Sequence, residues 1–545
     1  MTRIKPKSLQ SFRRRASVLL LALVVIALLT LGAMSFFDRM LVEHQATEAH
    51  IRQMQARLLA ESGMEFVRAL AMQDPLTLQQ SGGMYSNPAL FQGRLVIDDP
   101  LAAFRGRFTI IAPALSEAGY FSGIRYGLDN ESSRLNLNTV LLADNYEENG
   151  ARNLLMSLPG MTETIADAIL DWIDSDNDQR QLGAEQEYYS ALSPPYAPRN
   201  GPLGSIEELL LVRDVTPSLL FGADLNRNSL IETNEEPYTA IPGVDNSTGM
   251  LNRGWAAYLT IDSAEKNTKA DGTPKIDINM QDLQELHKQA LTVLSEAEAN
   301  FIVAYRQGGP EDENNGGNNN AAVNTRTVEA SSLDIDFNLP GRERLNNLLD
   351  LVGVRTRVVD NNQQQQQGGQ GGPGGQGQNQ QTTVCESPFK NEPGAMRTFM
   401  PKLFDNFGVN SSASIPGRIN INQAPRPLLI GIPGMDSMIV DQIIAMRLPV
   451  DDGQRPEQKY EVWPLMNGIV DLAQMKQLMP LVTAGGDVYR AQVIGYFDEG
   501  GPAYRAEAVI DAAQATPVVK RRRDLVDQGP GYTLETLGVT VDEAE

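Results

Sequence analysis

The sequence predicts an α+β protein in which a long N-terminal helix packs on an antiparallel sheet. A large, mainly helical insertion with helix-hairpin-helix-like repeats divides that sheet. Three observations lead to this prediction: an apolar run that continues as an amphipathic helix, alternating segments towards both ends of the remaining chain, and a motif that occurs three times between them. The 545 residues are enough for several domains, and the formal net charge of −22 disfavours nonspecific binding to nucleic acids.

The N-terminus predicts a membrane span. Residues 1–15 contain six basic and no acidic residues, and the run 16–37 that follows is almost entirely apolar. A helix of about 22 residues reaches about 33 Å, which matches the hydrocarbon core of a bilayer. The basic residues place the N-terminus in the cytoplasm and the bulk of the chain beyond the membrane. Residues 38–72 lack proline and have apolar residues at helical spacing, so we expect the helix to continue. A plain signal anchor and a cleaved secretory signal are the alternatives.

Alternating segments predict the strands of the sheet. Residues 107–113 and 124–128 form one pair of candidate strands, and residues 487–513 form another pair around a turn at 499–502. We expect these four strands to pack on the N-terminal helix. The second and third strands are then separated by one insertion of about 360 residues.

An Asn-x-Asn-like motif opens three segments of the insertion, at 134–140, 275–281 and 418–424. The first and third copies lead to Pro-Gly turns, at Pro159 and Gly160 and at Pro433 and Gly434, each followed by an apolar helical pattern. The second copy lacks the turn but keeps a helix at 299–306. A glycine turn followed by a helix N-cap is typical of a helix-hairpin-helix, which commonly binds the DNA backbone. Residues 163–178 hold six acids and no base, so a packing role is favoured over DNA binding.

Two acidic loops predict calcium sites of EF-hand-like spacing. Alternate carboxylates in a tight loop converge on one hard cation, and an acid at position twelve completes the shell. The first loop offers Asp174, Asp176, Asp178 and Glu185, and the second offers Asp224, Asn226, Asn228, Glu232 and Glu235. The first loop has more carboxylates, and Ser229 replaces the preferred glycine of the second, so we expect tighter binding by the first. The alternative is a pair of solvated acidic turns.

Enzymatic chemistry is not expected. The single cysteine, Cys385, excludes an internal disulfide and is expected to be a free or intermolecular thiol, and three histidines without suitable neighbours form no zinc site. A membrane-bound calcium-dependent hydrolase is the enzymatic alternative, but the chain lacks the Gly-x-Ser-x-Gly and His-Glu-x-x-His motifs of hydrolases. Residues 311–320 and 361–381 are rich in Asn, Gly and Gln and are expected to be flexible.

The basic leader, the small residue before the apolar run and the extended helix resemble the N-terminus of type IV pilins and pseudopilins. Residues 124–141 and 168–217 closely resemble the general secretion pathway protein K family, which shares the Asn-x-Asn motif, the D-W-x-D acidic loop, Gly-Ala-Glu, Tyr-Tyr and P-L-x-S-x-x-E-L in this order. The resemblance covers about the first 220 residues. Two positions depart from the pilin pattern: Ala16 replaces the usual Gly, and Leu21 replaces the usual Glu, which protein K also lacks.

This resemblance implies a pilin-like fold and a non-enzymatic minor pseudopilin at the pseudopilus tip of a type II secretion system. It implies a single-pass protein of the inner membrane with its bulk in the periplasm, prepilin cleavage between Ala16 and Ser17, calcium in the insertion, and a complex with two other minor pseudopilins. The pseudopilus, secreted substrates and the outer-membrane secretin are further candidate partners; nucleic acid is not. The alternative is a membrane-anchored helix-hairpin-helix protein for DNA uptake, or a type IV pilus minor pilin.

The expected division of the chain follows from these assignments. It comprises a basic prepilin leader (1–16), a transmembrane helix (17–37), a stem helix (38–72), the first pilin-like strands (73–130), the helical insertion with hairpin repeats and acidic loops (131–310), a flexible spacer with short ordered segments (311–416), the third hairpin region (417–484), and C-terminal strands with a tail (485–545).

Overall fold

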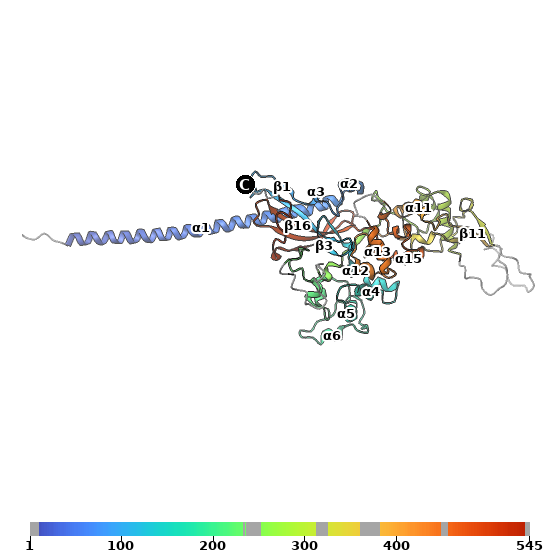
Figure 1. Cartoon of the computed structure of the whole chain (residues 1–545), viewed down its shortest axis with the longest axis horizontal. Helices are drawn as coiled ribbons and strands as arrows, with labels where there is room; N and C mark the ends of the chain where they lie inside the picture. The colour runs from blue at the N-terminus through green and yellow to red at the C-terminus, as the bar shows by residue number, and fades with distance from the viewer. Residues whose placement is uncertain are drawn as a thin grey trace, which may run out of the picture.

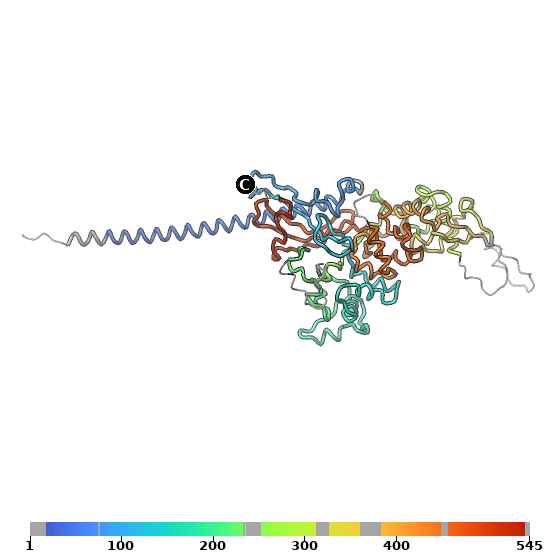
Figure 2. The backbone as a smooth tube through the Cα atoms, in the orientation of Figure 1, coloured from blue at the N-terminus to red at the C-terminus, as the bar shows by residue number. Residues whose placement is uncertain are grey.

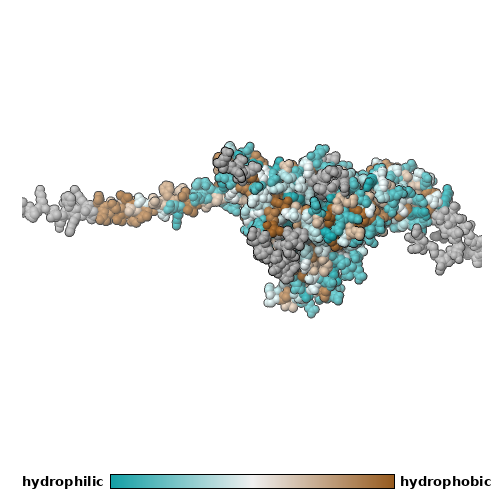
Figure 3. Space-filling model, viewed as in Figure 1, coloured by the Kyte–Doolittle hydropathy of each residue, from teal (hydrophilic) through white to brown (hydrophobic). Residues whose placement is uncertain are grey.

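A single long helix leads into a mixed α/β body in the computed structural model, which describes residues 10–232, 235, 252–311, 325–359, 382–447 and 456–539 (Figure 1). Helix α1 spans Gln10–Ala71 without a break, as predicted for a span followed by a stem. Among the described residues it is the one helix long and apolar enough to cross a membrane. The apolar part of α1 projects away from the body (Figure 3), whereas Ala56, Leu59 and Ala60 are buried against it.

The sheet that α1 contacts has seven strands and is antiparallel throughout, which confirms the prediction of a long N-terminal helix on an antiparallel sheet. The strand order is β1-β2-β16-β17-β18, with β3 paired to β2 and β4 paired to β16. The strands are β1 (Arg94–Ile97), β2 (Gly106–Leu115), β3 (Phe121–Tyr126), β4 (Asp129–Asn130), β16 (Val488–Phe497), β17 (Tyr504–Asp511) and β18 (Val518–Asp524). The four predicted strands correspond to β2, β3, β16 and β17. Three strands were not predicted: β1, whose four residues are all exposed, the two-residue β4 and the basic β18.

Glycines allow α1 to lie directly on the sheet. A Cβ atom added at Gly495 of β16 would lie 2.2 Å from the backbone oxygen of Ala56 and 2.6 Å from the backbone nitrogen of Ala60. A Cβ atom at Gly63 of the helix would lie 2.6 Å from Val493 Cγ1. Because backbone rather than a flexible side chain opposes Gly495, no larger residue fits there without moving the helix.

The insertion begins at β4 and ends at β16, two strands that pair with each other at Asn130 and Tyr489. Its helices are α4 (Gly150–Met156), α5 (Glu163–Ile173), α6 (Gln186–Ser190), α7 (Pro217–Phe221), α8 (Leu283–Ala290), α9 (Glu296–Gly308), α11 (Pro393–Asn406), α12 (Arg426–Gly431), α13 (Ser437–Met446), α14 (Trp463–Met466) and α15 (Leu472–Leu478). Two short helices, α2 (Pro75–Gln80) and α3 (Pro88–Phe91), precede the sheet.

Short strands hold the insertion together. They are β5 (Leu135–Asn136), β6 (Leu259–Thr260), β7 (Ala264–Lys266), β8 (Ile276–Asp277), β9 (Thr325–Val328), β10 (Arg355–Arg357), β11 (Thr382–Glu386), β12 (Phe407–Gly408), β13 (Ser414–Pro416), β14 (Ile419–Asn420) and β15 (Val482–Thr483). The three Asn-x-Asn segments supply β5, β8 and β14, and each of these pairs in parallel with a later strand, β6, β12 and β15 respectively.

The Asn-x-Asn motif has the same structural role in all three copies. The first side chain accepts a hydrogen bond from the backbone amide two residues on: Asn136 from Asn138 at 3.0 Å, Asp277 from Asn279 at 2.9 Å, and Asn420 from Asn422 at 2.9 Å. The second asparagine then donates to distant backbone carbonyls, of Leu203, of Leu345 and Val409, and of Gln458 and Ala484. The motif therefore ties each short strand to a remote loop of its own segment.

Helices follow each motif in contacting pairs. Helices α4 and α5, α8 and α9, and α12 and α13 are in contact. Gly160 and Gly434 occupy the left-handed region, with φ of 71° and 84°, and Thr162 and Asp436 cap the helices that follow. The third pair also contacts the first through α12 and α4, and Figure 2 shows the segment after residue 417, in orange, between the other two.

The region predicted as a spacer contributes to the main core where it is described. Phe399, Met400 and Leu403 of α11 are buried in the large core cluster of the insertion, because apolar residues recur at helical spacing there. Cys385 is free, as predicted, but it is fully buried in β11, which leaves no access for an intermolecular disulfide. Residues 361–381, predicted to be flexible, lie outside the described residues.

We predict that Gly495→Ala destabilises the full-length chain in detergent by about 1–3 kcal/mol or more, because the new methyl group meets the backbone of α1. Gly485→Ala is the matched control, since a Cβ atom at Gly485 meets nothing within 4 Å. Thermal unfolding followed by circular dichroism measures both. Equal melting temperatures of the two variants would contradict the close packing of α1 on β16.

Candidate functional site

Three carboxylates meet at the C-terminal end of α5. Asp171 lies on the last turn, Asp174 caps the helix, and Glu185 returns from the following loop, with one oxygen of each within 4.8 Å of the others. Asp171 is fully buried and Glu185 is 4% exposed. Both carboxylate oxygens of Glu185 and Oδ1 of Asp174 are buried without a hydrogen-bond partner. Buried acceptors without donors are costly unless a cation or water satisfies them, so this donor set fits a hard divalent cation.

The charge of this cluster is only partly neutralised. Arg180 Nη1 donates to Asp171 Oδ1 at 2.8 Å and also to Asp174 Oδ2, and it leaves Glu185 unpaired. Burial, followed by repulsion from Asp171 and Asp174, raises the pKa of Glu185 to about 7. A Cβ atom at Gly183 would lie 1.9 Å from Asp171 Oδ2, so the Gly-Ala-Glu sequence requires glycine at this position.

The structure brings together only part of the set predicted for the first loop. Asp174 and Glu185 are in the cluster. Asp176 and Asp178 are exposed, and Asp176 Oδ1 accepts a hydrogen bond from the Asp178 amide at 2.9 Å within a local turn. Asp171 was missed, because EF-hand spacing counts forward from Asp174. The helical spacing could have identified Asp171, because residues three apart, such as Asp171 and Asp174, lie on the same face of a helix.

The second loop is folded around its own acceptors. Asp224 accepts from the amides of Asn228 and Ser229, both at 3.0 Å. Glu235 accepts from the amides of Leu225 at 2.9 Å and Glu232 at 3.2 Å, and burial raises its pKa. The side-chain amides of Asn226 and Asn228 donate to Glu232 Oε1 at 2.9 and 2.8 Å. The residues predicted for the second site thus lie close together, and their carboxylates already accept hydrogen bonds from groups of the protein. The side-chain oxygens of Asn226 and Asn228 in turn accept from the backbone amides of Asn228 and Leu230, at 3.0 and 2.8 Å, which fixes the orientation of both side chains.

The second loop also joins the insertion to the C-terminal part of the chain. Asn228 Nδ2 donates to the carbonyl of Gly531 at 2.9 Å, and the Tyr532 hydroxyl donates to the carbonyl of Asn228 at 3.1 Å. Gln492 of β16 donates to the carbonyl of Arg227 at 3.0 Å. These contacts give the loop a structural role that its acidic spacing did not indicate.

Strand β18 makes a second connection between sheet and insertion. Arg521 pairs with Asp262 and Arg523 pairs with Glu207, two acids of the insertion, while Arg522 pairs with Glu61 of α1 at 2.8 Å. Residues 520–523 are the sequence Lys-Arg-Arg-Arg, a dense basic cluster on this strand. Its acidic partners among the described residues belong to the same chain.

A buried ion pair marks the point where the insertion leaves the sheet. Glu131 is fully buried and accepts from Arg490 Nε of β16 at 2.5 Å, and Arg490 also pairs with Glu507 at 3.1 Å. Burial alone would raise the pKa of Glu131, but attraction to Arg490 and Arg134 outweighs it and lowers the pKa to about 2. The pair therefore stays charged over the physiological range.

Comparison with known proteins assigns the segment that contains the first acidic cluster. The family model described as type II secretion system (T2SS), protein K, matches residues 133–221, which include α4, α5 and the carboxylates of Asp171, Asp174 and Glu185. This segment of the chain is therefore similar to protein K of the type II secretion system. The family match ends before the second loop begins at Asp224.

Individual members of the protein K family are similar over a larger part of the chain. Type II secretion system protein K of Pectobacterium carotovorum subsp. carotovorum is 28% identical over 213 residues, 38% of this chain and 60% of the relative. The protein of the same name from Klebsiella pneumoniae is 25% identical over 207 residues, with coverage of 38% and 60%. The chain thus spans 60% of the length of these curated relatives. A chain of the crystal structure of the GspK-GspI-GspJ complex from enterotoxigenic Escherichia coli is similar with a TM-score of 0.28 and 14% identity, over 89% of this chain and 99% of that chain.

We predict that Glu131→Gln destabilises the protein by about 3–5 kcal/mol, because it leaves Arg490 buried without its main partner. Glu117→Gln, at an exposed position, is the control. The folded pKa of Glu131 is below its ordinary value of 4.5, so the stabilisation is present above pH 4.5 and is lost as the pH falls towards 2. Denaturant unfolding at pH 7 and at pH 3 measures this. A variant that matches the control at pH 7 would contradict the role of the pair.

Proposed function

We propose that this chain is a non-enzymatic minor pseudopilin of a type II secretion system, which supports protein export across the outer membrane from the tip of the pseudopilus. The observation that supports this most directly is α1, whose first part is apolar and exposed and whose second part packs on an antiparallel sheet. The first part needs a membrane or the apolar helices of other subunits around it, since nothing in the described chain covers it. The similarity of residues 133–221 to protein K of the type II secretion system supports the pseudopilus as the assembly in which this helix packs.

The proposed position is the inner membrane, with the N-terminus in the cytoplasm and the body in the periplasm. The six basic residues before the span support this orientation. We infer that a prepilin peptidase cleaves between Ala16 and Ser17, and that the exposed face of α1 then packs on other minor pseudopilins. The pseudopilus, secreted substrates and the outer-membrane secretin are further proposed partners of the body.

The helix pairs support a scaffold function. We interpret α4–α5 and α12–α13 as helix-hairpin-helix repeats that pack on each other through α4 and α12. DNA uptake is the second candidate function, since such hairpins commonly hold DNA by backbone amides and nearby bases. In the first hairpin Arg152 is bound to Asp167 at 2.7 and 2.8 Å, and in the third Arg426 is bound to Asp441, so these bases already have carboxylate partners. The charge of the chain favours the scaffold.

We infer that calcium stabilises the insertion. In the first site Asp171, Asp174 and Glu185 would hold the ion, which would supply the charge that their unpaired oxygens lack. Binding of a cation keeps the three carboxylates ionised, and it fixes the end of α5 to the Gly-Ala-Glu loop. The second site, with Asp224, Asn226, Asn228, Glu232 and Glu235, is proposed to bind more weakly, because backbone amides already satisfy its carboxylates.

We predict an N-terminus at Ser17 when the protein is produced with the other components of a type II secretion system. Intact-mass spectrometry of the membrane fraction measures it, and Ala16→Phe, which removes the small residue at the junction, should leave the leader in place. Co-purification with small pseudopilins is expected for the processed chain. An unprocessed chain that binds DNA with sub-micromolar affinity at physiological salt would support the uptake protein instead.

We predict that millimolar calcium stabilises the chelator-treated protein, by about 2.7 kcal/mol at a hundredfold excess over Kd. Asp171→Asn and Glu185→Gln should each abolish most of the shift in melting temperature, whereas Asp224→Asn should reduce it less.

Asp178→Asn separates the two possible ligand sets. It removes the same charge from the same loop, but Asp178 lies outside the carboxylate cluster, so the calcium shift should persist. A shift that is lost in Asp178→Asn and kept in Asp171→Asn would favour EF-hand spacing over the cluster. The absence of any calcium shift in the unmodified protein would show that neither loop binds calcium.

A further inference from the structure

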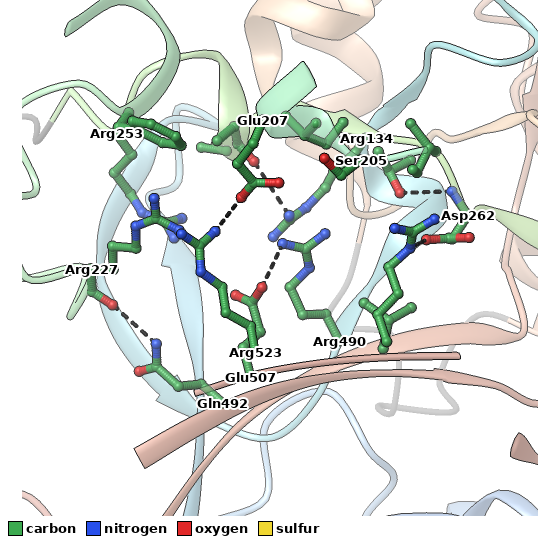
Figure 4. A pocket seen from close by; sticks show the side chains of 18 of the residues that line it. Arg134, Ser205, Glu207, Arg227, Arg253, Asp262, Arg490, Gln492, Glu507 and Arg523 are labelled. Carbon is green, nitrogen blue, oxygen red and sulfur yellow. Dashed lines mark hydrogen bonds and ion pairs between the residues drawn. The ribbon is translucent and has the colours of Figure 1, made fainter. Parts of the chain in front are cut away.

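A cavity of about 580 Å³ lies between the insertion and the sheet, in the range of small-molecule sites (Figure 4). Strands β16, β17 and β18 line one side. The insertion lines the other with Arg134, Glu207, Arg227 and Arg253. The cavity is separate from the carboxylate cluster of Asp171, Asp174 and Glu185, since none of these residues lines it.

The cavity is basic although the chain is strongly acidic. Eight basic and four acidic side chains line it, an excess of four positive charges in a chain whose net charge is −22. Several bases have close partners: Arg490 binds Glu131 and Glu507, and Arg521 binds Asp262. These pairs hold the interface together and leave little free charge in their half of the cavity.

Three other arginines, two from the insertion and one from β18, are less fully neutralised. Arg227 has no hydrogen bond or ion pair from its guanidinium to any described residue, and its guanidinium carbon lies 4.4 Å from the centre of the Phe221 ring. Arg253 has Nε and Nη1 buried without hydrogen-bond partners. Its nearest carboxylate, Asp224 at 3.5 Å, already accepts from two backbone amides. Arg523 has a single carboxylate partner, Glu207.

The charged ends of these three side chains converge (Figure 4). Burial, followed by repulsion from Arg523, lowers the pKa of Arg227, as expected for guanidinium groups that face each other with little negative charge between them. Arg227 and Arg253 come from the insertion and Arg523 comes from β18. The repulsion therefore acts across the interface that the other ion pairs hold closed.

We propose that this cavity binds an oxyanion of the phosphate class, held by Arg227, Arg253 and Arg523. Guanidinium groups present planar forks that match the oxygens of phosphate, and an oxyanion with up to two negative charges and several acceptor oxygens can satisfy three such forks at once. The bound anion bridges the insertion and the sheet. Inorganic phosphate and small phosphoesters share this chemistry.

The source of the anion is the surrounding solution rather than a lipid headgroup. The cavity lies in the body, whereas the exposed part of α1 between residues 38 and 52 places about 20 Å of helix between the end of the apolar run and the first buried turn. A headgroup at the bilayer surface does not extend across that distance.

The test is calorimetric titration of the full-length chain in detergent with inorganic phosphate, in calcium-free buffer at constant ionic strength set with chloride. Saturable binding is expected. Arg227→Gln should weaken it about tenfold or more, since one charged hydrogen-bond donor group is lost. Arg397→Gln is the control, because Arg397 is exposed, lies outside the cavity and gives the same change in charge.

Glu207→Gln provides a test that misfolding cannot imitate. This variant removes the acid that competes for Arg523, so phosphate should bind about threefold to fivefold more tightly. Competition by glycerol 3-phosphate would identify a phosphoester as an accepted form of the ligand. No saturable heat with either compound, or equal affinities in Arg227→Gln, Glu207→Gln and Arg397→Gln, would overturn the proposal.

Discussion

The contact between the backbone of α1 and the backbone of β16 at Gly495 is the constraint on which the rest of the structure depends. Backbone lies against backbone there, with Ala56 and Ala60 on the helix side. The close approach places α1 across the middle of the sheet, so that β16 has a helix on one face and strands β2 and β17 at its two edges. The strand that receives the helix also receives the end of the insertion.

The insertion is held on the sheet largely by polar groups. Glu131 with Arg490, the second acidic loop with Gln492 and Tyr532, and β18 with Asp262 and Glu207 all cross the interface. The large apolar cluster lies within the insertion, and the cluster beneath α1 lies within the sheet unit. Charged contacts across this interface fix the orientation of the insertion on the sheet more than they strengthen its attachment, because the cost of desolvation offsets much of their attraction.

The part of the fold that follows from local periodicity was predictable from the sequence. Helix α1, strands β2, β16 and β17, and the caps at Thr162 and Asp436 all have signals within a few residues. Strand β18 was not predicted, because its basic residues are placed by acids up to about 460 residues away in the chain. Asp171 was missed for a related reason: its partner Glu185 is close in sequence, but α5 and not the loop spacing brings the two together. The Asn-x-Asn motif was found, yet its hydrogen bonds to remote carbonyls required the folded chain.

Asn130 and Tyr489, the two points at which the insertion departs and returns, are partners in one antiparallel ladder. Because the insertion leaves and re-enters the sheet at paired residues, the sheet does not restrict the length of the insertion. The entropic cost of closing a longer loop rises only with the logarithm of its length. Whole segments with their own parallel strand pair and helix pair can therefore be gained or lost while the sheet and α1 stay as they are. The chain contains three such segments, and in each one the two short strands pair before the next segment begins. This arrangement is expected if segments are duplicated within an insertion whose two ends stay fixed on the sheet.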